Sequence, residues 1–168
     1  MMTQPARKTR TAAPKTDVVI ESALWKGMDD VGSIVRRAIA EAATMLSTPP
    51  AELAIVLTDD STIRQLNAAW RGVAEATNVL SFPTPRGADQ PTLIGDIVLA
   101  YQTIEREARA QGKPFAHHVA HLCVHGYLHL LGYDHMQDTD AEAMDQVERE
   151  VLQRLSIADP YRHFGTVS

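Results

Sequence analysis

The stretch His125-Gly-Tyr-Leu-His129-Leu-Leu-Gly-Tyr-Asp-His135 holds two histidines four residues apart and a third that follows a glycine. On a helix, side chains at positions i and i+4 lie on one face, so His125 and His129 can bind one metal ion together. Gly132 predicts the end of this helix, because glycine accepts the left-handed conformation that ends helices. His135 can then fold back over the ion. Three histidines with one open position are typical of a catalytic zinc site.

His121 lies on the same face of the predicted helix but eight residues before His129, which is roughly 12 Å of helical rise. One ion with bonds of about 2 Å cannot contact both rings. We therefore predict that the metal ligands are His125, His129 and His135. Asp134 is an alternative ligand, although we favour it as the group that orients one of the imidazoles. His121 is left as a residue beside the site, either supporting a ligand or facing the substrate.

The spacing of the histidine pair is similar to the zinc-protease signature H-E-x-x-H, in which the glutamate is the general base. Gly126 stands at that position and cannot accept a proton. A metal ion on three histidines could still lower the pKa of a bound water toward neutrality. The pattern therefore predicts a hydrolytic site that differs from the usual peptidases in its substrate.

The composition fits one soluble globular domain. The chain has 168 residues, 45% of them hydrophobic, and no apolar run long enough to span a membrane. Its one cysteine, Cys123, cannot form an internal disulfide, which fits a reducing compartment, and we expect a cytoplasmic location. We predict a flexible basic tail at residues 1–16, a metal-dependent hydrolase domain at 17–158 and a C-terminal tail at 159–168.

The charge distribution argues against a globally basic nucleic-acid binder, because the net charge is −5. The first 133 residues carry 13 basic and 13 acidic side chains, whereas the remaining residues carry 3 basic and 8 acidic ones. RNA binding is thus permitted by the charge but not indicated by it. Most of the late acids fall on the predicted last helix, where we expect a solvated face. These acids are Asp138, Asp140, Glu142, Asp145, Glu148 and Glu150.

Hydrophobic periodicity predicts elements in the order β-α-β-α-β-β-α-α-α, an α+β fold with a mixed four-stranded sheet and about five helices. The strand at 52–58 is almost continuously apolar, which favours a central place in the sheet. The strands at 78–82 and 95–100 flank a proline-rich loop and are expected to be antiparallel neighbours. The other expected elements are a strand at 18–20 and helices at about 28–46, 59–70, 102–111, 114–132 and 139–155, the fourth being a zincin-like metal helix.

The segment 125–135 resembles the signature of the YbeY family of bacterial endoribonucleases and rRNA maturation factors. Two further blocks agree with that family. One joins Leu66-Asn-Ala-Ala-Trp-Arg-Gly72 to Thr77-Asn-Val-Leu-Ser-Phe-Pro83, and the other is Ile94-Gly-Asp-Ile-Val-Leu-Ala100. The resemblance runs from about Glu52 to Leu155. Three separate motifs in the right order make a chance match very improbable.

The resemblance implies a single-strand-specific endoribonuclease with one Zn²⁺ per chain, acting in 16S rRNA 3′-end maturation and ribosome quality control. The implied partners are single-stranded ribosomal RNA and the small ribosomal subunit or its proteins. Arg71 is the candidate catalytic residue, because a guanidinium can bind phosphate oxygens in a bidentate manner. Residues 73–76 depart from the family, which often has a Lys-Asp-Lys-type run there. Any help from those lysines in holding RNA is lost in this chain.

Two other functions remain open at this point. The zincin-like spacing suggests a zinc-dependent amide hydrolase or peptidase, although Gly126 opposes it. A ribosome-assembly factor without catalysis, in which zinc only holds the fold, is the non-enzymatic alternative. Chelation distinguishes a catalytic ion from a structural one, because only a structural ion unfolds the domain when it is removed.

Overall fold

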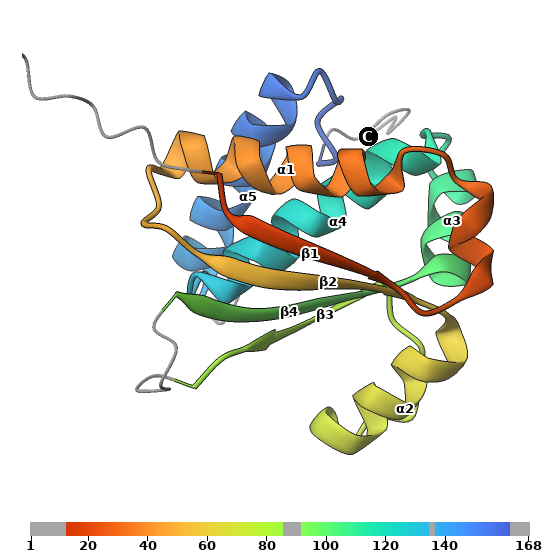
Figure 1. Cartoon of the computed structure of the whole chain (residues 1–168). Coiled ribbons are helices and arrows are strands. Elements are labelled where there is room, and N and C mark those ends of the chain that lie inside the picture. The colour runs from red at the N-terminus through yellow and green to blue at the C-terminus, as the bar shows by residue number, and fades with distance from the viewer. Residues whose placement is uncertain (1–12, 86–91, 135–136, 162–168) are drawn as a thin grey trace, which may run out of the picture.

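The computed structural model of the chain describes residues 13–85, 92–134 and 137–161. One mixed sheet of four strands, in the order β1-β2-β4-β3, lies at its centre with helices on both faces (Figure 1). The strands are β1 (Lys15–Ile20), β2 (Glu52–Thr58), β3 (Val79–Pro83) and β4 (Leu93–Ala100).

The pairing follows the predicted scheme. β2 runs parallel to both β1 and β4 and lies inside the sheet, while β3 pairs antiparallel with β4 and forms one edge. Leu53, Ile55 and Leu57 on one face of β2 are buried in the main core, whereas Ala54 and Val56 on the other face are only partly buried. The predicted α+β class and mixed four-stranded sheet are confirmed.

Five α-helices and one short 3₁₀-helix complete the part of the chain that the structure describes. Helices α1, α3, α4 and α5 lie on one side of the sheet, and α2 lies alone on the other (Figure 1). The sequence did not indicate the 3₁₀-helix, which buries Trp25 and hydrogen-bonds its indole N–H to the Thr58 carbonyl. The helices are η1 (Ala23–Gly27), α1 (Val31–Leu46), α2 (Asp60–Arg71), α3 (Tyr101–Ala110), α4 (Phe115–Leu130) and α5 (Asp138–Arg154).

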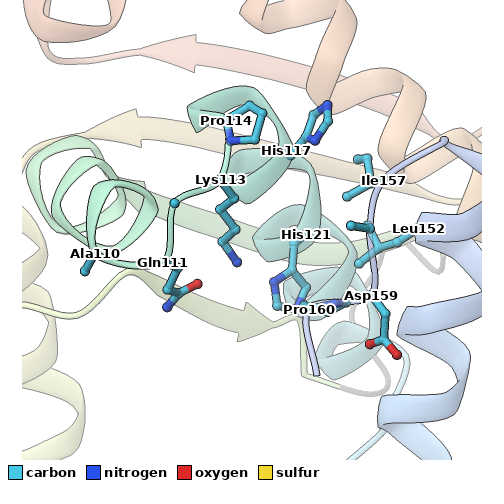
Figure 2. Close-up of a pocket in the computed structure, with 12 residues that line it drawn as sticks. Ala110, Gln111, Lys113, Pro114, His117, His121, Leu152, Ile157, Asp159 and Pro160 are labelled. Carbon is cyan, nitrogen blue, oxygen red and sulfur yellow. The ribbon is translucent and has the colours of Figure 1, made fainter. Parts of the chain in front are cut away.

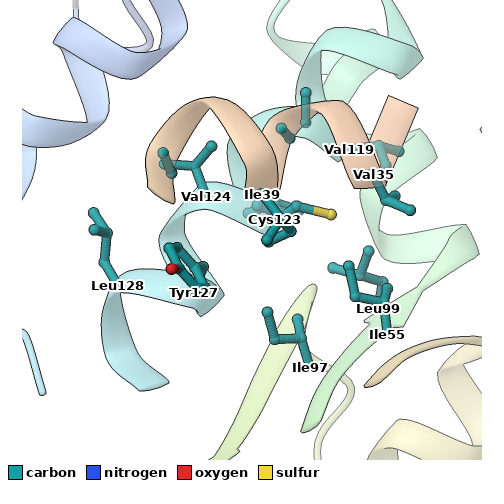
Figure 3. Close-up of a cluster of buried hydrophobic side chains, with 14 of the residues drawn as sticks. Val35, Ile39, Ile55, Ile97, Leu99, Val119, Cys123, Val124, Tyr127 and Leu128 are labelled. Atoms are coloured by element: carbon teal, nitrogen blue, oxygen red, sulfur yellow. The ribbon is translucent and has the colours of Figure 1, made fainter. Parts of the chain in front are cut away.

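The main core lies between the sheet and α1, with α4 packed in the middle of it (Figure 3). Val119, Cys123 and Tyr127 of α4 are fully buried against Ile97 of β4 and Ile39 of α1. Each such aliphatic or aromatic side chain contributes about 1.5–3 kcal/mol by leaving water. Burial also raises the pKa of the Cys123 thiol, so this cysteine acts as an apolar side chain. The core therefore holds α4 firmly at one register against the sheet.

A smaller cluster lies on the opposite face of the sheet, under α2. Ile63 of α2 is fully buried there against Leu80 of β3 and Val98 of β4. Helix α2 begins at Asp59, whose carboxylate accepts from the Thr62 N–H at 2.9 Å. It ends at Gly72, which adopts the left-handed conformation. The two faces of the sheet thus differ in how much structure covers them.

The ends of the predicted domain differ from the structure. β1 begins at Lys15, inside the segment predicted as a tail. Pairing with β2 uses the backbone and does not require apolar side chains. At the other end, Tyr161 lies in the predicted 159–168 tail, yet its hydroxyl donates to buried Glu148. Residues 1–12 and 162–168 lie outside the described residues. In the described ranges, no helix combines the length and the apolar character that crossing a bilayer requires.

Candidate functional site

Helix α4 brings His125 and His129 together, as their spacing predicts. Their Nε2 atoms are 3.1 Å apart, and both side chains are partly exposed on the helix face that turns away from the core. After the helix, Gly132 adopts a φ of 100°, in the left-handed region predicted for it. This turn carries the chain back over the last turn of α4.

The Nδ1 atom of each ring makes a hydrogen bond. His125 Nδ1 lies 2.5 Å from Glu148 Oε1, and His129 Nδ1 lies 3.0 Å from the carbonyl oxygen of Tyr133. A carboxylate and a carbonyl can only accept, so both Nδ1 atoms donate. This tautomer leaves a lone pair on each Nε2, and the two lone pairs face each other across 3.1 Å.

Two imidazole nitrogens that carry lone pairs at this separation can both bind one cation. Tetrahedral zinc with Zn–N bonds of about 2.0–2.1 Å places two ligand nitrogens about 3.3 Å apart, close to the distance here. The pair and its hydrogen-bonded partners therefore fit a metal ion held through Nε2.

The third predicted ligand, His135, lies outside the described residues, and its role stays a prediction. Within the ranges that the structure describes, no group of three potential ligand side chains is arranged around one point. Glu148 and the Tyr133 carbonyl orient the two rings of α4. Asp134 is exposed, and its predicted role in orienting an imidazole stays a prediction.

Glu148 is the residue of the site that the sequence analysis missed. It was assigned to the solvated face of the last helix, but it is completely buried. Its carboxylate also accepts from His121 Nε2 at 3.2 Å and from the Tyr161 hydroxyl. Burial alone would raise the pKa of Glu148, but the hydrogen bonds from His121 and His125 outweigh it and lower the pKa to about 2. The residue is a carboxylate at neutral pH.

A signal for Glu148 was present in the sequence. Met144, Val151 and Leu152 are all fully buried and lie four before, three after and four after it on α5. Glu148 thus stands on the apolar stripe of the helix, where an ionised side chain needs partners. The neighbouring Glu142 and Glu150 are exposed as expected. The position of each residue around the helix, rather than its place in a run of acids, therefore distinguishes buried Glu148 from exposed Glu142 and Glu150.

A cavity of about 620 Å³ is lined by the histidine pair and by Arg71. Arg71 is exposed in the last turn of α2, immediately before Gly72, which ends the helix with a φ of 71°. Residues of β3 line the same cavity. The remaining lining residues are Thr77, Asn78, Val79, Ser81, Pro83, Gly132, Tyr133 and Asp134. The fold thus brings the candidate cation and the two histidines to one cavity.

The missing protease glutamate has a packing explanation. A Cβ at Gly126 would lie 2.9 Å from Ile97 Cγ2 and 3.1 Å from Ser81 Oγ, both closer than ordinary contacts. The Ser81 hydroxyl also donates to the Gly126 carbonyl at 3.0 Å. This position faces the sheet rather than the cavity. A glutamate here would crowd these side chains of β3 and β4 and would point toward the sheet, which opposes the peptidase arrangement.

A family model described as Endoribonuclease YbeY matches residues 21–156. The chain belongs to this family. Two curated relatives carry the same name. The protein of Rhodopseudomonas palustris (strain BisB18) is 51% identical over 91% of this chain and 95% of its own length. That of Nitrobacter hamburgensis is 49% identical over 89% of this chain and 83% of its own. The predicted family is confirmed.

The fold also has a solved counterpart. The solution structure of TM1509 from Thermotoga maritima aligns with a TM-score of 0.51, covering 88% of this chain and 99% of that one. The sequences are 22% identical, so this likeness concerns the fold alone.

A second cavity of about 620 Å³ lies on the other side of His121 in this family member (Figure 2). Lys113, His117 and Asp159 line it together with His121, between the turn that precedes α4 and the segment that follows α5. A smaller cavity of about 280 Å³ shares His121 with this one and His125 with the Arg71 cavity. The three cavities therefore adjoin one another along α4.

Proposed function

We propose that this chain is a metal-dependent endoribonuclease that cleaves single-stranded RNA. The observation that carries the proposal is the pair of facing Nε2 atoms of His125 and His129, with Arg71 across the same cavity. The names of its relatives support the reaction type. A cavity of about 620 Å³ has the size of an ordinary small-ligand pocket and suits an extended nucleotide strand better than a duplex.

In this proposal, His125, His129 and His135 hold one Zn²⁺. When bound, the ion would polarise a phosphoryl oxygen and lower the pKa of a coordinated water. Glu148 keeps His125 in the tautomer that carries its proton on Nδ1 and its lone pair on Nε2, and the Tyr133 carbonyl does the same for His129. Imidazole ligands suit zinc, although they also suit other transition metals.

Arg71 supplies the second positive charge. A phosphodiester is already an anion and gains negative charge on its equatorial oxygens as it is attacked. A guanidinium carries a positive charge and can bind two of these oxygens at once. No described residue hydrogen-bonds it, so its donors are left for a ligand. Its place opposite the histidines lets it bind the same phosphate that they approach.

The biological role belongs to the same proposal. We infer from the family that the substrate is ribosomal, that the reaction contributes to 16S rRNA 3′-end maturation and ribosome quality control, and that it takes place in the cytoplasm. The small ribosomal subunit or its proteins are the expected partners. The family motifs of the chain, together with its family membership, support this assignment.

Elemental analysis combined with cleavage assays tests the proposal. Protein purified without added metal should hold one zinc ion per chain and should cut single-stranded RNA but not casein. Chelation should stop cleavage while the far-UV circular dichroism persists. The ion should be lost in His125→Ala and kept in His121→Ala. Casein cleavage would favour the amide hydrolase, and unfolding on chelation would favour a structural ion.

A further inference from the structure

Trp70 is the most exposed large apolar side chain in the part of the chain that the structure describes. Its relative exposure is 72%, whereas the only other tryptophan, Trp25, is fully buried. Trp70 lies in the last turn of α2, one residue before Arg71. An indole left in water forfeits one of the largest hydrophobic gains available to any side chain. Its position beside the cavity therefore calls for a ligand.

The local structure holds Trp70 in place. Its ring contacts Phe82 of β3 edge to face, with centroids 5.7 Å apart and planes at 61°. The segment after α2 is tied back to the helix, because Arg64 Nε donates to the Ala74 carbonyl at 3.1 Å and Asn67 Nδ2 donates to the Glu75 carbonyl at 2.9 Å. The indole is thus exposed on an ordered element, and little conformational entropy is lost when something stacks on it.

The ring packs against β3, the strand that also borders the Arg71 cavity. Ser81 and Pro83 line the Arg71 cavity, and Phe82, which stands between them, points to the opposite face because side chains alternate along a strand. Trp70 meets Phe82 on that face. Because β3 is an edge strand, a polymer leaving the cavity past Arg71 crosses this edge toward Trp70.

A protein partner fits this surface less well. A stable protein interface covers about 800 Å² on each side and has an apolar centre. Near Trp70, the only other exposed large apolar residue among those described is Val73, at 43%. The remaining ones, Val19, Ile20 and Leu24, belong to β1 and η1 at the other edge of the sheet. One aromatic ring next to a phosphate-binding arginine suits a nucleic-acid strand.

We propose that Trp70 is a stacking platform for a base of single-stranded RNA whose neighbouring phosphate lies on Arg71. The inference rests on the proposed RNA substrate. Unpaired bases expose their faces, and aromatic side chains bind them by stacking with little dependence on sequence. The platform orients the strand outside the cavity, and Arg71 and the histidine side bind the phosphate next to the stacked base. It also selects single strands, because the bases of a duplex are already stacked.

Fluorescence and affinity measured with an eight-nucleotide single-stranded DNA test this platform. A matched octamer with abasic sites keeps the phosphates and removes the bases. The intact octamer should quench the emission of Trp70, while buried Trp25 stays unchanged. Trp70→Ala should weaken binding of the intact octamer about fivefold or more and leave the abasic octamer unaffected. Trp70→Phe should retain part of the affinity, and Trp70→Leu should not. Val73→Ala is the control and should match the wild type.

Equal affinity of the wild type and Trp70→Ala for the intact octamer would overturn the inference, as would full affinity in Trp70→Leu. In either case RNA cleavage by the wild type would leave the proposed function standing, and a protein partner would become the competing explanation for Trp70. Base-dependent binding through Trp70 without any RNA cleavage would instead remove the nuclease and keep the platform. Because the side chain is mostly exposed, none of these variants should disturb folding.

Discussion

The two walls of the Arg71 cavity are built differently. On the α4 wall, His125 and His129 are each oriented by a hydrogen bond, one of them to a carboxylate that water does not reach. At the end of α2, Arg71, which lines the cavity, and Trp70, the residue before it, are exposed to solvent. The difference indicates a division of labour in the proposed mechanism. The fold itself orients the two histidines of the proposed metal site, whereas the guanidinium and the indole on the proposed substrate side face solvent.

The largest expected effect comes from the exposed wall and concerns activity alone. Arg71→Glu should reduce RNA cleavage by about 100-fold or more, because it removes a charge that stabilises the transition state. Metal content and thermal stability should hardly change, since the side chain is exposed. Arg71→Lys should keep a fraction of the activity, because it preserves the charge but not the bidentate geometry.

Arg37→Glu, at an exposed position on α1 away from the cavity, is the matched charge reversal. Full activity in Arg71→Glu would remove Arg71 from the mechanism. Loss of metal in that variant would show that Arg71 supports the metal site, and the two sides of the cavity could then not be assigned separate roles.

A substitution on the buried α4 side should instead change metal affinity and stability. Glu148→Gln places amide protons opposite groups that themselves donate, so it should lower both metal affinity and stability. Loss of a partner that orients a metal-bound histidine costs about 10- to 100-fold in affinity. Metal titration and urea unfolding measure the two effects. Glu150→Gln, on the exposed face of the same helix, should change neither. Unchanged metal affinity in Glu148→Gln would mean that the Tyr133 turn alone orients the pair.

Gly126 lies where α4 packs against β3 and β4. Gly126→Ala should destabilise the protein by about 1–3 kcal/mol through overpacking against Ile97 and Ser81, a cost that the better helix propensity of alanine offsets by only about 1 kcal/mol. Gly32→Ala in α1 is the control, because its new Cβ would meet only the mobile end of Arg36. Urea midpoints compare the two variants. A Gly126→Ala protein as stable as Gly32→Ala would show that α4 packs against the sheet loosely enough to accept an extra methyl group.

His118 extends the comparison to a buried histidine outside the Arg71 cavity. Burial lowers its pKa from 6.5 to about 4, against the opposing hydrogen bond to Glu107 at 2.9 Å. The unfolded chain therefore binds the proton more readily than the native one. The associated stability is complete above pH 6.5 and declines as the pH falls toward 4, by roughly 3 kcal/mol at most. His118→Gln should lose this part of the slope of melting temperature against pH. An unchanged slope would place the titration elsewhere.

Much of the architecture followed from local patterns. The apolar run of β2, the periodicity of α1 and the glycines after α2 and α4 all act through neighbouring residues, and the elements formed where they were expected. The spacing of His125 and His129 belongs to the same class, because one helical turn fixes their relation. The family resemblance added Arg71, which no local rule would have singled out.

What the sequence determined by itself is therefore the five α-helices, the four strands and the pair of histidines, since helical hydrogen bonding and side-chain phase along one element depend on residues close in the chain. Only the tertiary structure decided the full order of the strands, that Glu148 is buried between two histidines of another helix, that Gly126 packs where a side chain would be crowded, and that Arg71 lines the same cavity as the histidines. Each of these depends on contacts between distant segments. Packing sets such contacts, and a single sequence records them only in the phase of each residue on its own helix or strand.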